Sequence, residues 1–316
     1  MKQSHSLSTR MSFEAYPVKH RITWVFALPL IVLACIILGQ MMVVIPAVKT
    51  GFIARDAFEV YPNILYFLVA PFTANICLIF LWVRFFERRT LSSLGLKLTP
   101  ALPKNIALGY LTALVMGSLV VAFIFISGGY EQAIPSLGRS SSLIPVLLLF
   151  FAFGVQSSVE EIVFRGYLFS RFSERYGLWI GIAANSVLFT LLHLLNFDFE
   201  TRSLLSLFLF SFMTLVFSIY LSLKVIQLGT IWFACAWHAG WNWLFICGFG
   251  VPTTGITLDI RPLIADFDLV SQSPDWLTGG IGGPEDSIFT SAILIIMCIV
   301  GIYRCRKINA LITKVD

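Results

Sequence analysis

Long apolar stretches, separated by shorter polar segments, run along most of the chain. A helix needs about 20 mostly apolar residues to cross a bilayer. Eight stretches meet this requirement: 22–45, 62–86, 105–127, 143–165, 178–196, 203–223, 229–250 and 287–303. The pattern therefore predicts an all-α fold, a polytopic membrane bundle of about eight transmembrane helices.

Composition supports the same class. Of the 316 residues, 58% are hydrophobic and only 12% are charged, whereas soluble domains carry about 25% charged residues. So little charge excludes an ordinary soluble enzyme, a disordered chain and a nucleic-acid binder. The six cysteines form no C-x-x-C pair, so zinc ribbons and thiol redox motifs are unsupported.

The basic residues indicate an orientation. If the N-terminus is cytoplasmic, 17 of the 22 Lys and Arg fall in cytoplasmic segments, as the positive-inside rule requires. We therefore expect a multi-pass protein of the cell membrane with both termini in the cytoplasm. The expected segments are a cytoplasmic tail at 1–21, the bundle at 22–303, an external loop at 251–286 and a cytoplasmic tail at 304–316.

Charged side chains inside a bilayer are costly and usually functional. Only two acids, Glu160 and Glu161, lie clearly within a predicted span, and two of the four histidines, His193 and His238, do so as well. These residues belong to three different spans. We therefore expect a functional site where the three helices meet.

Helical spacing separates the roles of the two acids. Glu161 and Arg165 are four residues apart, so they share a helix face and can pair. Glu160 points about 100° away from Glu161 and lacks that partner, which leaves it free to act as a general base.

The same spacing relates the remaining candidates. Phe189 is four residues before His193, so its ring can wall the pocket of that imidazole. His238 and Asn242 are also four residues apart. They place two hydrogen-bond donors on one face, an arrangement that suits a developing oxyanion. A structural interpretation, in which these polar groups only join neighbouring helices, is also open.

The three motifs together resemble the CPBP family of intramembrane proteases, which includes CAAX prenyl endopeptidases and abortive-infection proteins. The family pattern is Glu-Glu-x-x-x-Arg, Phe-x-x-x-His and His-x-x-x-Asn. Here it is 160–165, 189–193 and 238–242, within a protease core at about 143–250. The resemblance implies hydrolysis of peptide bonds in membrane-associated substrates. Glu160 would activate a water with the help of His193, His238 and Asn242 would hold the oxyanion, and Glu161 and Arg165 would brace the site.

Alternatives remain at this point. The Glu and the two His could form a zinc site with an open position, although the spacing is not H-E-x-x-H and we expect no metal or other cofactor. A transporter could use the same groups as a proton relay, and a non-catalytic scaffold or immunity protein could retain a relic site. The depth of Glu160 is a further difficulty, because it lies near the inner end of the fourth span unless that helix continues past Phe169.

Overall fold

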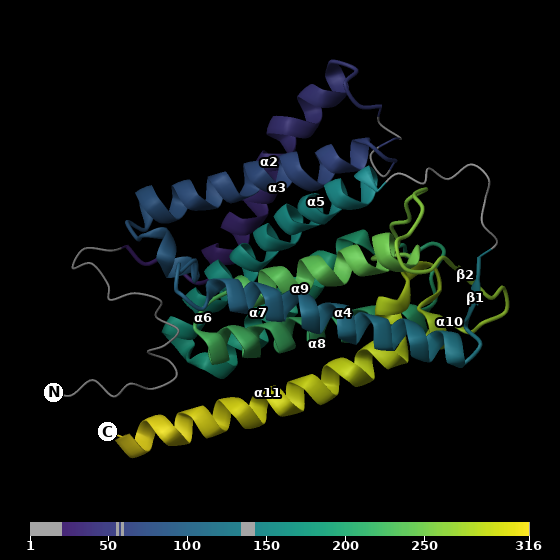
Figure 1. Ribbon diagram of the computed structural model, residues 1–316. Helices are drawn as coiled ribbons and strands as arrows, with labels where there is room; N and C mark the ends of the chain where they lie inside the picture. The colour runs from purple at the N-terminus through teal and green to yellow at the C-terminus, as the bar shows by residue number, and fades with distance from the viewer. Residues whose placement is uncertain (1–20, 55–56, 58–59, 134–142, 316) are drawn as a thin grey trace.

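The computed structural model describes residues 21–54, 57, 60–133 and 143–315, without the side chains of 309–315. Its long helices are α2 (Ala27–Lys49), α3 (Asn63–Leu81), α4 (Leu102–Ile126), α5 (Ile144–Glu161), α7 (Leu178–His193), α8 (Leu204–Leu228), α9 (Trp232–Trp243) and α11 (Ile288–Val315). Shorter helices are α6 (Phe169–Tyr176) and α10 (Asp275–Thr278), the π-helices η1 (Trp82–Phe86), η3 (Ile162–Leu168) and η5 (Leu244–Gly248), and the 3-10 turns η2 (Leu91–Leu94), η4 (Leu194–Asn196), η6 (Gly280–Gly282) and η7 (Pro284–Asp286). Most of the long helices run roughly along one direction, α2 crosses them steeply in this view, and together they form a bundle (Figure 1), which confirms the predicted all-α class.

Seven helical segments of the described chain are long and apolar enough to cross a membrane. The eighth predicted span, 229–250, is the pair α9 and η5, with 12 and 5 residues. This pair is shorter than the other spans, and nearly every side chain in it is buried. Hydrogen bonds fix both of its ends. At one end of the bundle, Trp232 Nε1 donates to the carbonyl oxygen of Lys97, and at the other end Trp243 Nε1 donates to the carbonyl oxygen of Val146.

Small residues allow α9 to sit at the centre of the bundle. A Cβ on Gly109 of α4 would lie 2.6 Å from the carbonyl oxygen of Phe233, and a Cβ on Gly240 would lie 2.8 Å from the ring of Tyr110. Glycine at both positions brings the backbones of α4 and α9 together, as small residues do between membrane helices. The central helix that carries His238 and Asn242 is thereby held closely against α4.

The fourth pass is longer than predicted. The expected span ended at 165, but α5, η3 and α6 form one helical run over Ile144–Tyr176, 33 residues long. Glu160 consequently lies near the middle of this run rather than at its inner end. This extension removes the difficulty over the depth of Glu160. Arg165, the last residue of the expected span, is fully buried.

One end of the bundle is closed by the segment after α3. Glu87, which is fully buried, accepts hydrogen bonds from Arg171 of α6 at 2.7 and 3.0 Å and from Thr23 at 2.7 Å. Arg89 pairs with Glu174 at 3.0 Å. These ion pairs fasten α3 to α6 and to the chain before α2.

The opposite end carries a cap built from 251–286, the predicted external loop. It contains a short strand, β2 (Phe267–Leu269), which pairs antiparallel with β1 (Tyr130–Gln132) after α4. Glu285 and Asp286 lie just before the last helix, which Ser287 caps by accepting a hydrogen bond from the amide of Thr290. Asp286 pairs with Arg202, and Glu285 bonds to groups beside the cavity described below.

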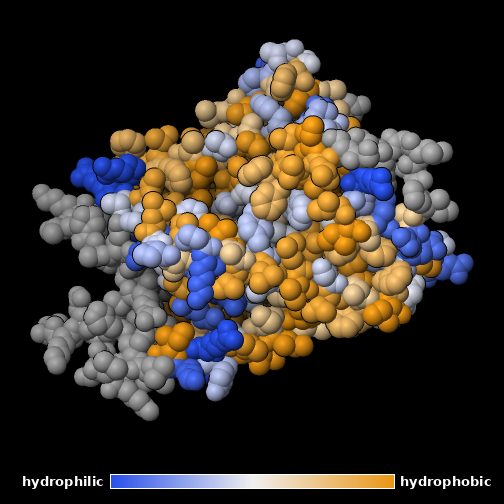
Figure 2. Space-filling view, in the orientation of Figure 1, coloured by the Kyte–Doolittle hydropathy of each residue, from blue (hydrophilic) through white to orange (hydrophobic). Residues whose placement is uncertain are grey.

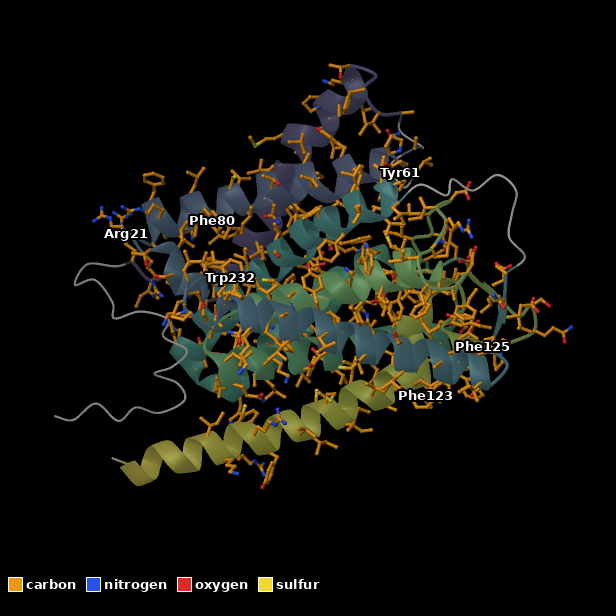
Figure 3. All side chains as sticks on the ribbon, in the orientation of Figure 1. Arg21, Tyr61, Phe80, Phe123, Phe125 and Trp232 are labelled. Atoms are coloured by element: carbon orange, nitrogen blue, oxygen red, sulfur yellow. The ribbon has the colours of Figure 1, made fainter. Side chains whose placement is uncertain are left out.

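Hydrophilic residues gather towards both ends of the bundle (Figure 2). Arg21 and Trp232 lie towards one end in Figure 3, and Tyr61 and Phe125 lie towards the cap end. Figure 2 shows an orange middle with blue patches towards both ends. The segments predicted to be cytoplasmic contain these described basic residues outside the spans: Arg21, Arg88, Arg89, Lys97, Lys104, Arg171, Arg175, Lys224, Arg304, Arg306 and Lys307.

Some of the predicted features fall on residues outside the described part of the chain. The tail at 1–20 and the basic side chains of Lys2, Arg10, Lys19, Arg55, Arg139 and Lys314 lie outside the described residues. The predicted tail at 304–316 continues the last helix as far as Val315. The six cysteines are free.

Candidate active site

All seven candidate residues lie around one cavity or directly behind its wall. Glu160 comes from α5, His193 from α7, and His238 and Asn242 from α9. These four residues line a cavity with a volume of about 320 Å³. The side chains of Glu160 and His193 are 17% and 18% exposed, so the site is largely buried but reachable from the cavity.

Both imidazoles face the same carboxylate oxygen. Oε2 of Glu160 lies 3.9 Å from Nε2 of His193 and 3.8 Å from Nε2 of His238. Both separations exceed the hydrogen-bonding range, and this oxygen has no hydrogen-bond partner within the described part of the chain. Three polar atoms from three helices therefore converge on one small volume.

Each imidazole is held through its other nitrogen. Nδ1 of His193 lies 2.8 Å from the carbonyl oxygen of Phe189, and Nδ1 of His238 lies 2.8 Å from Oε1 of Glu161. A carbonyl and an ionised carboxylate only accept hydrogen bonds, so Nδ1 carries the proton in both rings. Nε2 of a neutral ring is then an acceptor, and it donates only when the ring is protonated.

The pairing of Glu161 with Arg165 is confirmed. Arg165 Nη1 donates to Glu161 Oε1 at 3.1 Å, and both side chains are fully buried. The same oxygen accepts from His238, which the helical spacing did not indicate. Glu161 therefore links the buried cation to the orientation of an imidazole on a different helix.

Phe189 has a larger role than a wall. The centroid of its ring lies 4.0 Å from the centroid of the His193 ring. The guanidinium carbon of Arg165 lies 4.4 Å from the same ring centroid, a distance at which the cation is attracted to an aromatic face. Phe189 thus spaces the buried Glu161–Arg165 pair from His193.

Gln156 is a site residue that the sequence analysis missed. Its Nε2 donates to Oε1 of Glu160 at 2.5 Å. Its Oε1 accepts from Asn242 at 3.3 Å and from the hydroxyl of Ser157 at 2.9 Å. Gln156 lies one helical turn before Glu160. Its position four residues from the candidate base is the feature of the sequence that could have identified it.

The π-helical turns follow the site residues directly. The chain changes from α5 to η3 just after Glu161, and from α9 to η5 just after Trp243. Single π turns within longer helices occur frequently at functional sites. Arg165 lies within the first of them and still reaches Glu161.

The cap contributes a second missed group. Glu285 lines the cavity and accepts hydrogen bonds from Trp241 Nε1 at 2.8 Å and from the amide and hydroxyl of Thr254 at 2.8 and 3.1 Å. Burial raises the pKa of this carboxyl above its usual range. Trp241 directly precedes Asn242, so Glu285 connects the cap to the helix that carries two of the candidate residues.

The described residues were also compared with the requirements of a metal site. Within the described residues, no three His, Cys, Asp or Glu side chains are grouped as metal ligands. Each of the two imidazole nitrogens lies 3.8–3.9 Å from the Glu160 carboxylate oxygen.

Comparison with known families gives one match. The family model described as "Rce1-like: Type II CAAX prenyl endopeptidase Rce1-like" matches residues 141–244. Residues 141–244 are Rce1-like. This Rce1-like segment contains all three motifs and every candidate residue, so it confirms the resemblance to the CPBP family.

The Rce1-like segment covers roughly a third of the chain and indicates an intramembrane peptidase of the CAAX type. With seven membrane-length apolar helices, the protein is a multi-pass membrane protein. No curated protein and no solved structure matches the chain.

Proposed function

We propose that the protein is an intramembrane endopeptidase that hydrolyses peptide bonds of membrane-associated substrates with a water activated by Glu160. The observation that carries this proposal is the convergence of Nε2 of His193 and Nε2 of His238 on Oε2 of Glu160, at 3.9 and 3.8 Å. Gaps of this length between polar groups suit a bridging water. The cavity there is about 320 Å³, large enough for water and a stretch of peptide.

In the proposed reaction, the water donates one hydrogen bond to Glu160 and the other to Nε2 of His193. Glu160 removes a proton as the water oxygen attacks the substrate carbonyl carbon. The carbonyl oxygen becomes an oxyanion, which accepts hydrogen bonds from His238 and Asn242. Glu160 then passes the proton to the departing nitrogen, the C–N bond breaks, and a carboxyl group and an amine are released.

The two histidines take different protonation states in this scheme. His193 is neutral, because its Nε2 has to accept a hydrogen bond from the water while Nδ1 donates to the Phe189 carbonyl. His238 is an imidazolium, because its Nε2 has to donate while Nδ1 is already bonded to Glu161. Glu161 at 2.8 Å and Glu160 at 3.8 Å supply the negative charge that supports this cation.

The function is tested by comparing protein termini in membranes that contain the wild type or Glu160→Gln. New N-termini that occur only with the wild type would identify substrates and cleavage positions. A second assay uses purified protein in detergent with a library of internally quenched decapeptides. Identical termini in both membranes, together with identical cleavage of the library, would contradict the proposal.

Gln156→Leu is expected to lower kcat about 10- to 100-fold with little change in KM. The substitution keeps the size of the side chain but removes the donor to Glu160 and the acceptor for Asn242, so Glu160 is no longer held towards the imidazoles. The measurement is steady-state kinetics on the best-cleaved decapeptide. Because the residues form one network, adding Asn242→Leu should cost less than the product of the two single effects; multiplicative effects would argue against a shared role.

Cleavage is expected to continue after treatment with EDTA or 1,10-phenanthroline, because the proposed nucleophile is activated by a carboxylate rather than by a metal. The measurement is the cleavage rate of the same decapeptide before and after chelation, followed by addition of zinc. Loss of activity with the chelator and recovery with zinc would instead favour the zinc-dependent form of the same hydrolysis.

A further inference from the structure

A second hollow, the side groove, opens beside the active site between α2, α3 and α7. Its volume is about 200 Å³, and its lining includes Leu33 and Gln40 from α2, Asn75 from α3 and Leu195 after α7. Glu160 and His193 line both the side groove and the main cavity. The candidate base can therefore be approached from two directions.

The outer rim of the side groove is apolar. Leu195 is 75% exposed and Leu33 is 38% exposed, and both belong to segments long and apolar enough to cross the membrane. The side groove therefore leads from the apolar outer surface of the bundle to the reacting groups.

Asn75 is the unusual residue in this groove. It lies near the middle of the membrane-length segment Asn63–Phe86, which comprises α3 and η1, and is only 7% exposed. Its buried Oδ1 has no hydrogen-bond partner among the described residues. Leaving a buried acceptor unsatisfied costs about 1–3 kcal/mol, and such a group needs an explanation such as a ligand.

The chemistry of the missing partner follows from the surroundings. Oδ1 needs an N–H or O–H donor, which the acyl chain of a lipid does not have. A peptide that leaves its helical conformation within the membrane has the complementary need, because its backbone amides lose their partners where no water replaces them. An asparagine amide and a peptide unit each offer one acceptor and a donor, so they match one another.

We propose that Asn75 binds a backbone N–H of the substrate in the side groove, and that an extended segment on one side of the scissile bond lies there. This assignment rests on the proposed peptidase function. It makes Asn75 a specificity-determining residue that recognises unwound peptide rather than a particular side chain. It also requires that the substrate segment beside the cleaved bond is not helical.

The test is a backbone N-methylation scan of the best-cleaved decapeptide. N-methylation removes one N–H at a time. With the wild type, one position is expected to raise KM about tenfold. Asn75→Leu is expected to raise KM for the unmodified peptide by about the same factor with kcat nearly unchanged, and methylation at that position should then add less than a twofold change.

Asn105→Leu is the matched control, because Asn105 is also 7% exposed and lies at the start of α4, away from both hollows. It should retain the full penalty for methylation at the sensitive position. Asn75→Ala takes the place of Asn75→Leu if the leucine variant does not fold.

The outcomes separate the two proposals. The role of Asn75 would be overturned, with the peptidase function intact, if N-methylation raised KM equally in the wild type and in Asn75→Leu. It would also be overturned if KM for the unmodified peptide fell in Asn75→Leu, the result expected of a groove that binds only apolar groups. Cleavage that persists in Glu160→Gln, or a wild type that cleaves no peptide in the library, would overturn both.

Discussion

Glu160→Gln is expected to lower kcat about 10³-fold while leaving the protein folded. General-base catalysis contributes about 10²–10⁴-fold, and glutamine cannot take the proton that the attacking water has to lose. The side chain keeps its shape, so Gln156 can still bond to it and the packing of α5 is unchanged. The measurement is kcat on the best-cleaved decapeptide, with thermal unfolding in detergent as the check on folding.

Two further variants make the result specific. Glu131→Gln applies the same substitution to an exposed carboxylate on β1 and should leave kcat unchanged. His193→Ala should also abolish cleavage, because the water loses its second acceptor. Wild-type rates in either Glu160→Gln or His193→Ala would remove the proposed mechanism.

Breaking the Glu161–Arg165 pair is expected to lower the free energy of unfolding by about 3–5 kcal/mol, the usual cost of leaving one buried charge without its partner. Arg165→Met is the sharper single variant, because it leaves the fully buried Glu161 carboxylate with His238 as its remaining partner. The measurement is unfolding in detergent, followed by circular dichroism and compared with Glu160→Gln. Unchanged unfolding in Arg165→Met would contradict the pairing.

The double variant Glu161→Leu/Arg165→Met separates stability from catalysis. Replacing both members of a buried pair with apolar residues is often neutral or stabilising, so most of the lost stability should return. Activity should not return, because Nδ1 of His238 no longer has a carboxylate to hold it. Recovery of both properties would show that Glu161 acts only in folding.

The sequence predicted the class of fold because each apolar stretch has to satisfy its own backbone in lipid, and a helix is the local way to do so. It failed at the end of the fourth pass. The predicted span ended at Arg165, yet the helical run continues to Tyr176. Arg171 is accommodated there because Glu87, 84 residues earlier, neutralises it. A partner so distant in the chain is invisible to local hydropathy.

The site shows the same division. Spacing within a single helix was sufficient for Glu161 with Arg165 and for Phe189 with His193, since residues four apart share a face. It was insufficient for Gln156, which looked like an ordinary polar residue until Asn242 was found beside it. It was also insufficient for Glu285, because the cap turns this carboxylate towards Trp241, 44 residues earlier in the chain.

The sequence by itself determined which groups this protein places within a membrane: one free carboxylate, one paired carboxylate, two imidazoles and an amide on three apolar helices. These are properties of composition and helical periodicity, and both are local. Only the tertiary structure decided that Nε2 of both imidazoles faces Oε2 of Glu160, and that Asn75 lies in a groove opening to the same atoms. Those relations depend on the distances between helices far apart in the chain, which packing alone sets.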